Sequence, residues 1–107
     1  MAKRKRNTAN VAPALAALGH EARLSVYRLL VRAGEDGLTV GEISSLTDIP
    51  ASTLAHHIRS LVQAGLVIQE KRGREVLNWP DFDAMREIMS FLTSECCTGV
   101  YLRTGAA

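Results

Sequence analysis

The stretch that decides the fold is PASTLAHHIRSLVQAG, residues 50–65. Its apolar side chains recur every three or four residues, which predicts a helix with one buried stripe. The stripe consists of Leu54, Ile58, Leu61 and Val62. Pro50 is tolerated in the first turn, where its missing N–H is not needed. Gly65 suits the left-handed backbone conformation that commonly ends a helix. The stretch is therefore predicted to be one complete helix.

The opposite face of this helix is polar. It gathers hydrogen-bonding side chains of moderate length and one guanidinium group, namely Ser52, Thr53, His56, Arg59 and Gln63. Such groups can read base edges in a DNA major groove and bind the neighbouring phosphates. On one helix alone an ordinary solvated face is the commoner meaning of this pattern, so the surrounding elements decide.

A shorter helix is predicted just before the long one. Thr39 and Glu42 have the spacing of a capping box, in which the Thr39 hydroxyl accepts from the N–H of Glu42 and the carboxylate reaches back. A two-turn helix would follow, and residues 47–49 would turn the chain into the long helix. A short helix, a turn and a longer helix with a polar face make a helix-turn-helix.

Two β-prone runs follow the long helix, at residues 66–70 and 75–79. Between them lie Lys71, Arg72, Gly73 and Arg74, which predicts a hairpin with a basic tip. By itself such a tip only aids solubility, but directly behind a helix-turn-helix it is placed to meet the DNA backbone. The predicted fold is a winged helix-turn-helix, mainly α-helical with a small β-hairpin.

Further helices are predicted over residues 11–18, over residues 20–33 and from Phe82 onward. The chain of 107 residues has few aromatic side chains and forms one domain with a small aliphatic core, which favours association of two copies. The N- and C-terminal helices carry apolar side chains that such an association would bury. The predicted homodimer interface consists of Leu15, Leu18, Phe82, Met85, Met89 and Leu92.

Charge is distributed unevenly. Lys3, Arg4, Lys5 and Arg6 account for more than the whole net charge of +2, so total charge does not argue for nucleic acid. The basic run followed by VAPALAAL resembles the start of a secretory signal, but the apolar part is short and contains Pro13. No run approaches the ~20 apolar residues of a membrane span. The two adjacent cysteines suit a reducing cytoplasm.

The predicted organisation has three parts. Residues 1–10 are expected to be a disordered basic arm, because they are polar and carry charge of one sign. Residues 11–97 would form the winged helix-turn-helix domain with its dimerisation helices, and residues 98–107 a flexible tail. We expect the protein in the cytoplasm, with no membrane partner.

Residues 16–97 resemble the ArsR/SmtB family of winged-helix repressors. The matching segments are LGHEARL at residues 18–24, STLAHHIRSLVQAGLV at 52–67 and KRGREV at 71–76. The second segment is the most specific. The resemblance implies a homodimer that occupies double-stranded operator DNA and leaves it when an inducer binds. The resemblance also implies that the residues in contact with DNA are Ser52, Thr53, His56, His57 and Arg59. A metal site at the paired histidines is disfavoured, because adjacent helical residues point about 100° apart.

Cys96 and Cys97 are the candidate sensor. The family's arsenic motif in the helix-turn-helix, a Cys-x-Cys pair, is absent because residues 39–42 read TVGE, and no histidine follows His57 to complete the zinc site of the last helix. The text LTSECCTG, residues 92–99, instead resembles the branch with a Cys pair near the end of the dimer helix. Soft thiolates favour thiophilic metalloids. The expected inducers are arsenite or methylarsenite, both As(III), or Sb(III), and no cofactor is required.

The geometry of this sensor is a separate question. Two thiolates leave a three-coordinate As(III) one ligand short, and hydroxide, chloride or a methyl group already on the arsenic would complete it. In a helix Cys96 would lie on the same face as the apolar residues of the predicted dimer interface, and Cys97 would point about 100° away. The two sulfurs would then meet only if the helix unwinds near Thr98 and Gly99. The alternatives are two small apolar residues at a helix end, another thiophilic metal, a redox signal, or no small-molecule sensor.

One enzyme class shares a motif with the chain. The segment from Cys97 to Thr104 matches the C-x5-R-[ST] pattern of thiol phosphatases and some arsenate reductases. In those enzymes the loop follows a strand and opens a helix whose N–H groups bind the oxyanion. Here the segment follows a predicted helix, and no later Asp can serve as general acid. We therefore predict no enzymatic activity.

Overall fold

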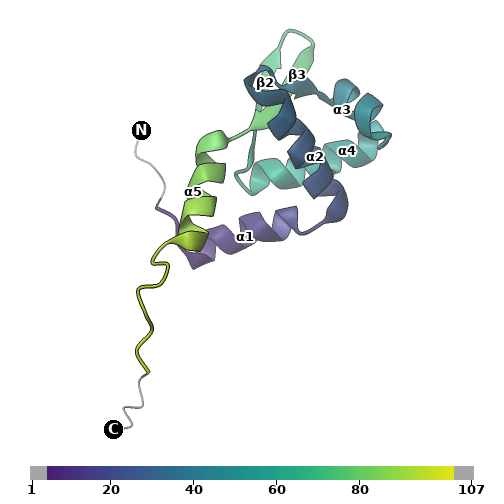
Figure 1. The fold of residues 1–107 in the computed structure, drawn as a ribbon. Helices are drawn as coiled ribbons and strands as arrows, with labels where there is room; N and C mark the ends of the chain where they lie inside the picture. Colours follow the sequence, from purple (N-terminus) through teal and green to yellow (C-terminus); the bar gives the residue numbers. More distant parts are fainter. Residues whose placement is uncertain (1–4, 103–107) are drawn as a thin grey trace.

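The computed structural model describes residues 5–102, and over this range five α-helices surround a small antiparallel sheet (Figure 1). In chain order the elements are α1 (Thr8–Leu18), α2 (Glu21–Ala33), the 3-10 turn η1 (Gly34–Asp36), β1 (Leu38–Thr39), α3 (Val40–Thr47), α4 (Ala51–Gln63), β2 (Val67–Arg72), β3 (Glu75–Pro80) and α5 (Phe82–Thr93). The helices α3 and α4 form the predicted helix-turn-helix, and β2 and β3 form the wing behind it. The predicted fold class is confirmed.

Both ends of the helix-turn-helix are built as the sequence predicts. The N–H of Glu42 donates to the Thr39 hydroxyl at 3.1 Å, and the N–H of Thr39 donates to the Glu42 carboxylate at 2.9 Å, so the capping box before α3 is complete. After α4, Gly65 has a φ of 78°, and the N–H of Leu66 donates to the carbonyl of Leu61 at 3.0 Å. This is a Schellman motif, which ends α4 and sends the chain directly into β2.

The sheet has three strands in the order β1-β3-β2, one strand more than the sequence analysis predicts. The extra strand, β1, pairs Leu38 with Asn78, and the buried Asn78 amide donates to the Leu38 carbonyl at 3.0 Å. The wing is also tighter than predicted, because β2 continues through Arg72, which pairs with Glu75. Only Gly73 and Arg74 form the turn. Gly73 has a φ of 63° at the first central position, where type II′ hairpin turns require glycine.

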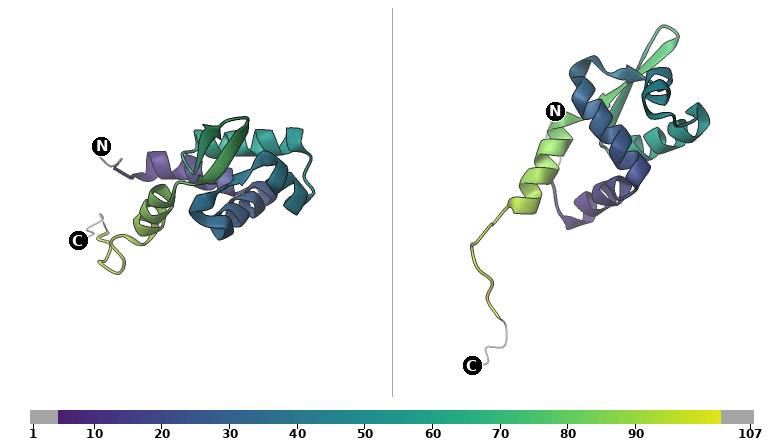
Figure 2. Two further views of the ribbon diagram at one scale, coloured as in Figure 1. Left: turned by 90° about the horizontal axis from the view of Figure 1, so that it is seen from above. Right: turned by 45° about the vertical axis from the view of Figure 1, so that its right-hand side comes forward.

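The core is aliphatic, as predicted, and lies between the helices and the sheet. It includes Leu30 of α2, Ile43 of α3 and Leu54 of α4, which have no exposed surface, and Ile88 of α5 joins the same cluster. Figure 2 shows α1 and α5 next to each other at one end of the domain, with α3 at the other end. The predicted dimerisation helices are therefore neighbours, and the helix-turn-helix lies away from them.

The start of α1 corrects the predicted boundary at residue 11. The helix begins at Thr8, because the side chains of Asn7 and Asn10 each accept from the other residue's backbone N–H at 3.0 Å. This capping box fixes the first turn, and Pro13 lies inside the helix. Arg6 pairs with Glu87 of α5 at 3.0 Å. Residues 8–10 are thus helical and not part of a disordered arm, while residues 1–4 lie outside the described range.

The end of α5 corrects the predicted position of the cysteines. The helix ends at Thr93, four residues earlier than the predicted boundary at 97, and Ser94 is extended with a ψ of 147°. Glu95 and Cys97 then adopt positive φ angles of 60° and 65°, which a continuing helix does not allow. Cys96 is therefore not on the stripe of α5. Residues 103–107 of the predicted tail lie outside the described range.

Candidate DNA interface and thiol site

The outward face of α4 carries most of the predicted recognition residues. Ser52, Thr53, His56 and Arg59 are all exposed, whereas Leu54 and Leu61 on the opposite face are completely buried. Pro50 makes no side-chain cap, and the first turn of α4 contains no acidic residue. The positive end of this helix is therefore open to an anion, unlike that of α3, which the Glu42 carboxylate occupies.

His57 does not belong to this face, and its predicted contact with DNA is corrected. It is only 9% exposed, its ring centroid lies 4.9 Å from that of His20 at the start of α2, and its Nδ1 has no hydrogen-bond partner within the described chain. Burial, together with the charges of His20, Arg23 and His56, lowers the pKa of His57. His57 is thus a neutral packing residue between α4 and α2.

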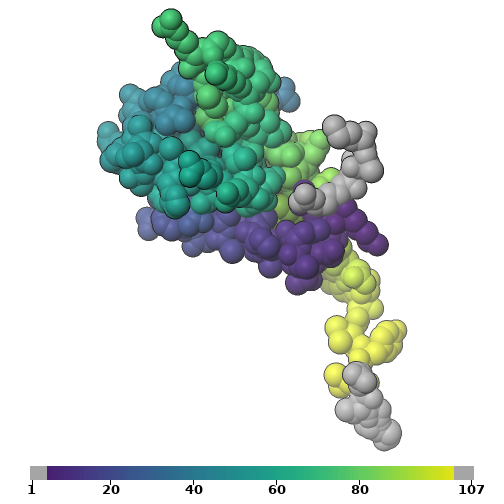
Figure 3. Space-filling view, turned by 180° about the vertical axis from the view of Figure 1, so that it is seen from behind, coloured from purple at the N-terminus to yellow at the C-terminus, as the bar shows by residue number. Residues whose placement is uncertain are grey.

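The wing presents the three predicted basic side chains. Lys71, Arg72 and Arg74 are exposed, and the wing shares one face of the molecule with α3 and α4 (Figure 3). Arg72 lies 2.6 Å from the Glu70 carboxylate, and both side chains are about half exposed. An exposed pair of this kind contributes little to stability, so a phosphate can compete for the guanidinium.

The structure brings the two thiols together. The sulfurs of Cys96 and Cys97 lie 3.0 Å apart, and both residues are exposed. Two successive turns hold the cysteines in place. The N–H of Cys96 donates to the carbonyl of Thr93, and the N–H of Thr98 donates to the carbonyl of Glu95, both at 3.2 Å. The predicted divergence of about 100° is wrong because α5 has already ended. The hydrogen bond with Cys97 raises the pKa of Cys96, so Cys96 is a thiol at neutral pH.

Within the described part of the chain, no third metal-binding side chain joins this pair. Between residues 5 and 102 the structure contains no group of three or more His, Cys, Asp or Glu side chains that could hold a metal ion. The two sulfurs are soft ligands that can bind one thiophilic ion together, with exposed space for ligands from solvent.

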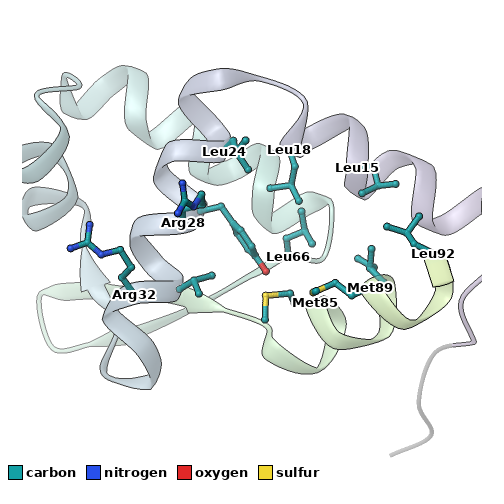
Figure 4. Close-up of a pocket in the computed structure, with 12 residues that line it drawn as sticks. Leu15, Leu18, Leu24, Arg28, Arg32, Leu66, Met85, Met89 and Leu92 are labelled. Atoms are coloured by element: carbon teal, nitrogen blue, oxygen red, sulfur yellow. The ribbon is translucent and has the colours of Figure 1, made fainter.

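Five of the six predicted interface residues line one groove between α1, α2 and α5, namely Leu15, Leu18, Met85, Met89 and Leu92 (Figure 4). Met89 and Leu92 are 61% and 57% exposed, which is unusual for large apolar side chains that lie together. Phe82 is not in this groove and lines a hollow beside Trp79. The sequence analysis missed Arg28 and Arg32 of α2, which flank the groove, although their spacing of four residues places them on one helix face.

Comparison with known proteins agrees with this architecture. A family model described as a helix-turn-helix domain matches residues 18–70. A Halobacterium salinarum protein named as an arsenical resistance operon repressor is 42% identical over 60 residues, which are 56% of this chain and 46% of that protein. The chain thus aligns with about half the length of this curated relative.

Solved structures show the same fold. An ArsR-like transcriptional regulator from Rhodococcus superposes with a TM-score of 0.68 at 24% identity, over 78% of this chain and 76% of that one. A homodimeric winged helix-turn-helix DNA-binding domain from Mycobacterium bovis superposes with a TM-score of 0.66 at 21% identity, over 96% of this chain and all of that one. None of the helices between residues 5 and 102 is long and apolar enough to cross a bilayer.

The fold and the exposed polar helix are those of a winged helix-turn-helix domain. The chain is similar to regulators of the ArsR family, in sequence over part of its length and in fold over most of it. The matched domain and the structural neighbours are helix-turn-helix domains and transcriptional regulators, not enzymes, in agreement with the sequence analysis. Two residues of the C-x5-R-[ST] motif, Arg103 and Thr104, lie outside the described range.

Stability should fall as the pH falls below about 6.5, the ordinary histidine pKa. Because the pKa of His57 is lowered in the folded protein, the unfolded chain binds the proton more readily, and protonation favours unfolding. In urea titrations at about pH 7.5 and pH 5.5, His57→Gln should lose less free energy of unfolding between the two pH values than the wild type. His56→Gln removes an exposed ring that makes the smallest contribution to the lowered pKa of His57, and as the control it should keep most of the wild-type loss. Equal losses in wild type and His57→Gln would contradict this role.

Proposed function

We propose that this protein is a cytoplasmic homodimeric repressor. It binds double-stranded operator DNA through α4 and the wing, and it leaves the DNA when As(III) or Sb(III) binds Cys96 and Cys97. The observation that supports the proposal most directly is the exposed polar face of α4 beside a basic wing, in a chain whose two thiols lie 3.0 Å apart.

The DNA contacts follow from side-chain chemistry. Ser52, Thr53, His56 and Arg59 can donate to or accept from base edges, and the open N-terminus of α4 suits a phosphate. The second set of contacts is electrostatic and lies on the wing, at Lys71, Arg72 and Arg74. Specificity would therefore come from α4 and general affinity from the wing.

His56→Ala and Arg59→Ala should each weaken operator binding by about 1–3 kcal/mol, because each removes a direct contact in the groove. Arg72→Ala should weaken binding to every DNA sequence and reduce the salt slope by about one unit. Fluorescence anisotropy at several salt concentrations measures both effects. Arg86→Ala removes an exposed guanidinium on α5 and is the matched control, expected to bind normally. Normal affinity in both α4 variants would refute the recognition helix.

A dimer is needed for this mode of binding. Two recognition helices meet successive major grooves only when they lie about 34–36 Å apart, which requires two copies of the domain. The apolar groove between α1 and α5 offers a self-complementary surface for that contact. The homodimeric domain from Mycobacterium bovis, which has the same fold, supports this assembly.

Met89→Asp should dissociate the dimer and abolish operator binding. Met89 is 61% exposed in the single chain, so a carboxylate is harmless in the monomer but would be buried in the dimer. Sedimentation velocity and DNA binding report the two effects, circular dichroism checks the fold, and Met89→Leu is the conservative control. A dimeric Met89→Asp protein with normal DNA affinity would place the interface elsewhere.

The thiol pair is proposed as the inducer site. Soft thiolates prefer thiophilic ions, and the named repressor of arsenical resistance supports an arsenical over other metals. With only two protein sulfurs, hydroxide, chloride or a methyl group on the arsenic would complete three-coordination. A redox signal is the second candidate, although adjacent thiols form only a strained small-ring disulfide.

The position of the site indicates how binding reaches DNA. The cysteines follow α5 directly, and α5 carries Met85, Met89 and Leu92 of the proposed dimer interface. An ion that fixes both sulfurs would constrain residues 94–98 and the last turn of α5, which changes the spacing of the two recognition helices. A coupling free energy of about 1–3 kcal/mol is enough to lower operator occupancy.

Cys96→Ser and Cys97→Ser should each bind operator normally but fail to release it with arsenicals, because one thiolate cannot hold the ion. Methylarsenite should release DNA at a lower concentration than arsenite, since its methyl group already fills one position. Release should become more sensitive as the pH rises, because binding displaces the proton that the raised pKa keeps on Cys96. Titration of the labelled operator complex with arsenite, methylarsenite, antimonite and zinc tests all three points. Full release from either single variant would falsify the paired site.

A further inference from the structure

The groove between α1, α2 and α5 has features that a dimer interface alone does not require. Its volume is about 380 Å³, and most of its walls are leucine, valine, isoleucine and methionine side chains. Mainly apolar pockets of a few hundred cubic ångströms with a few polar groups are the usual form of small-molecule sites. The polar groups here come only from α2: Tyr27, Arg28 and Arg32.

Exposed fractions separate an outer rim of the groove from its floor. Met89 and Leu92 on the rim are 61% and 57% exposed, whereas Tyr27 and Leu66 on the floor are 5% and 1% exposed. A second copy of the chain is expected to cover the rim. The floor at the α2 side lies deeper and is built from different residues.

The hydroxyl of Tyr27 is a buried donor with an unmet hydrogen bond. It has no partner among the described residues, although buried polar groups are normally paired. Burial and the nearby Asp81 carboxylate raise the pKa of Tyr27, so the hydroxyl keeps its proton. A ligand with an acceptor oxygen in the groove would satisfy it.

The charged side chains that line the groove are both basic, although the Asp81 carboxylate lies near the Tyr27 hydroxyl. Arg28 and Arg32 are exposed and lie at one end of the groove, while Leu15 and Leu92 lie at the other (Figure 4). Neither arginine forms a salt bridge within residues 5–102, and no acidic residue of this range lines the groove. A molecule that fits this surface has an anionic end and an apolar body.

We propose that the α2 side of the groove binds a small amphipathic anion, a carboxylate with a medium-length aliphatic body. Its carboxylate pairs with Arg28 and Arg32, and its body lies against Val31, Leu66 and Ile88. An oxygen of the ligand accepts from the Tyr27 hydroxyl. The site is separate from the thiols, and it would act on the contact between α2 and α5.

Octanoate is the probe for this site, titrated into the full-length protein by calorimetry. Octanoate should bind saturably, octan-1-ol about tenfold more weakly, and octylammonium more weakly still, because only the carboxylate suits the two guanidinium groups. Arg28→Gln should weaken octanoate binding at least tenfold and Tyr27→Phe several-fold. Arg74→Gln, which removes a wing guanidinium, is the matched control and should not change the affinity.

Three results would overturn the proposal: no saturable binding of octanoate, equal binding of the alcohol or the ammonium, or unchanged affinity in Arg28→Gln. The proposal would also be overturned if octanoate dissociated the dimer into monomers in sedimentation velocity. Such a result would mean that the second copy of the chain normally fills the groove. Arg28 is exposed, so its variant remains informative even if Tyr27→Phe does not fold. Operator binding and arsenical release are measured without octanoate, so the DNA and thiol proposals stand or fail separately.

Discussion

The burial of one face of α4 is the constraint on which the DNA-binding surface depends. Leu54, Ile58 and Leu61 are at most 2% exposed, which fixes the rotation of the helix about its axis. A rotation by one residue, about 100°, would turn Arg59 away from its present face and bury a polar side chain. The Schellman motif at Gly65 then fixes where the wing begins relative to this face. Packing in the core thus positions the exposed polar side chains of α4 and the wing, which are not part of the core.

The helix α2 connects the two ends of the domain. At its start, His20 packs against His57 of α4, and further along it Tyr27 lines the groove beside α5. A neutral, buried imidazole on one side and a buried, unpaired hydroxyl on the other are both sensitive to their surroundings. The helix α2 therefore contacts both the helix-turn-helix and the groove beside α5.

The thiol pair shows how the end of a helix can bring two adjacent side chains together. Adjacent side chains diverge within a helix, but the positive φ angles of Glu95 and Cys97 bring the two sulfurs to 3.0 Å. Both sulfurs are exposed, so an ion can reach them without opening the core. They lie directly after α5, the helix of the proposed dimer interface, and not on the exposed face of α4.

Local patterns in the sequence determined the helix-turn-helix, its capping box, the end of α4 and the presence of a hairpin, because the residues responsible lie within a few positions of each other. They also placed Ser52, His56 and Arg59 on one face. The end of α5 at Thr93 is set by local turns over residues 93–98, which helical periodicity does not reveal. Only the tertiary structure decided that His57 turns inward against His20, that β1 pairs with β3 and that Arg28 and Arg32 flank the groove. The burial and pairing of these groups involve residues far apart in the chain, and helical periodicity cannot tell a border position from a buried one.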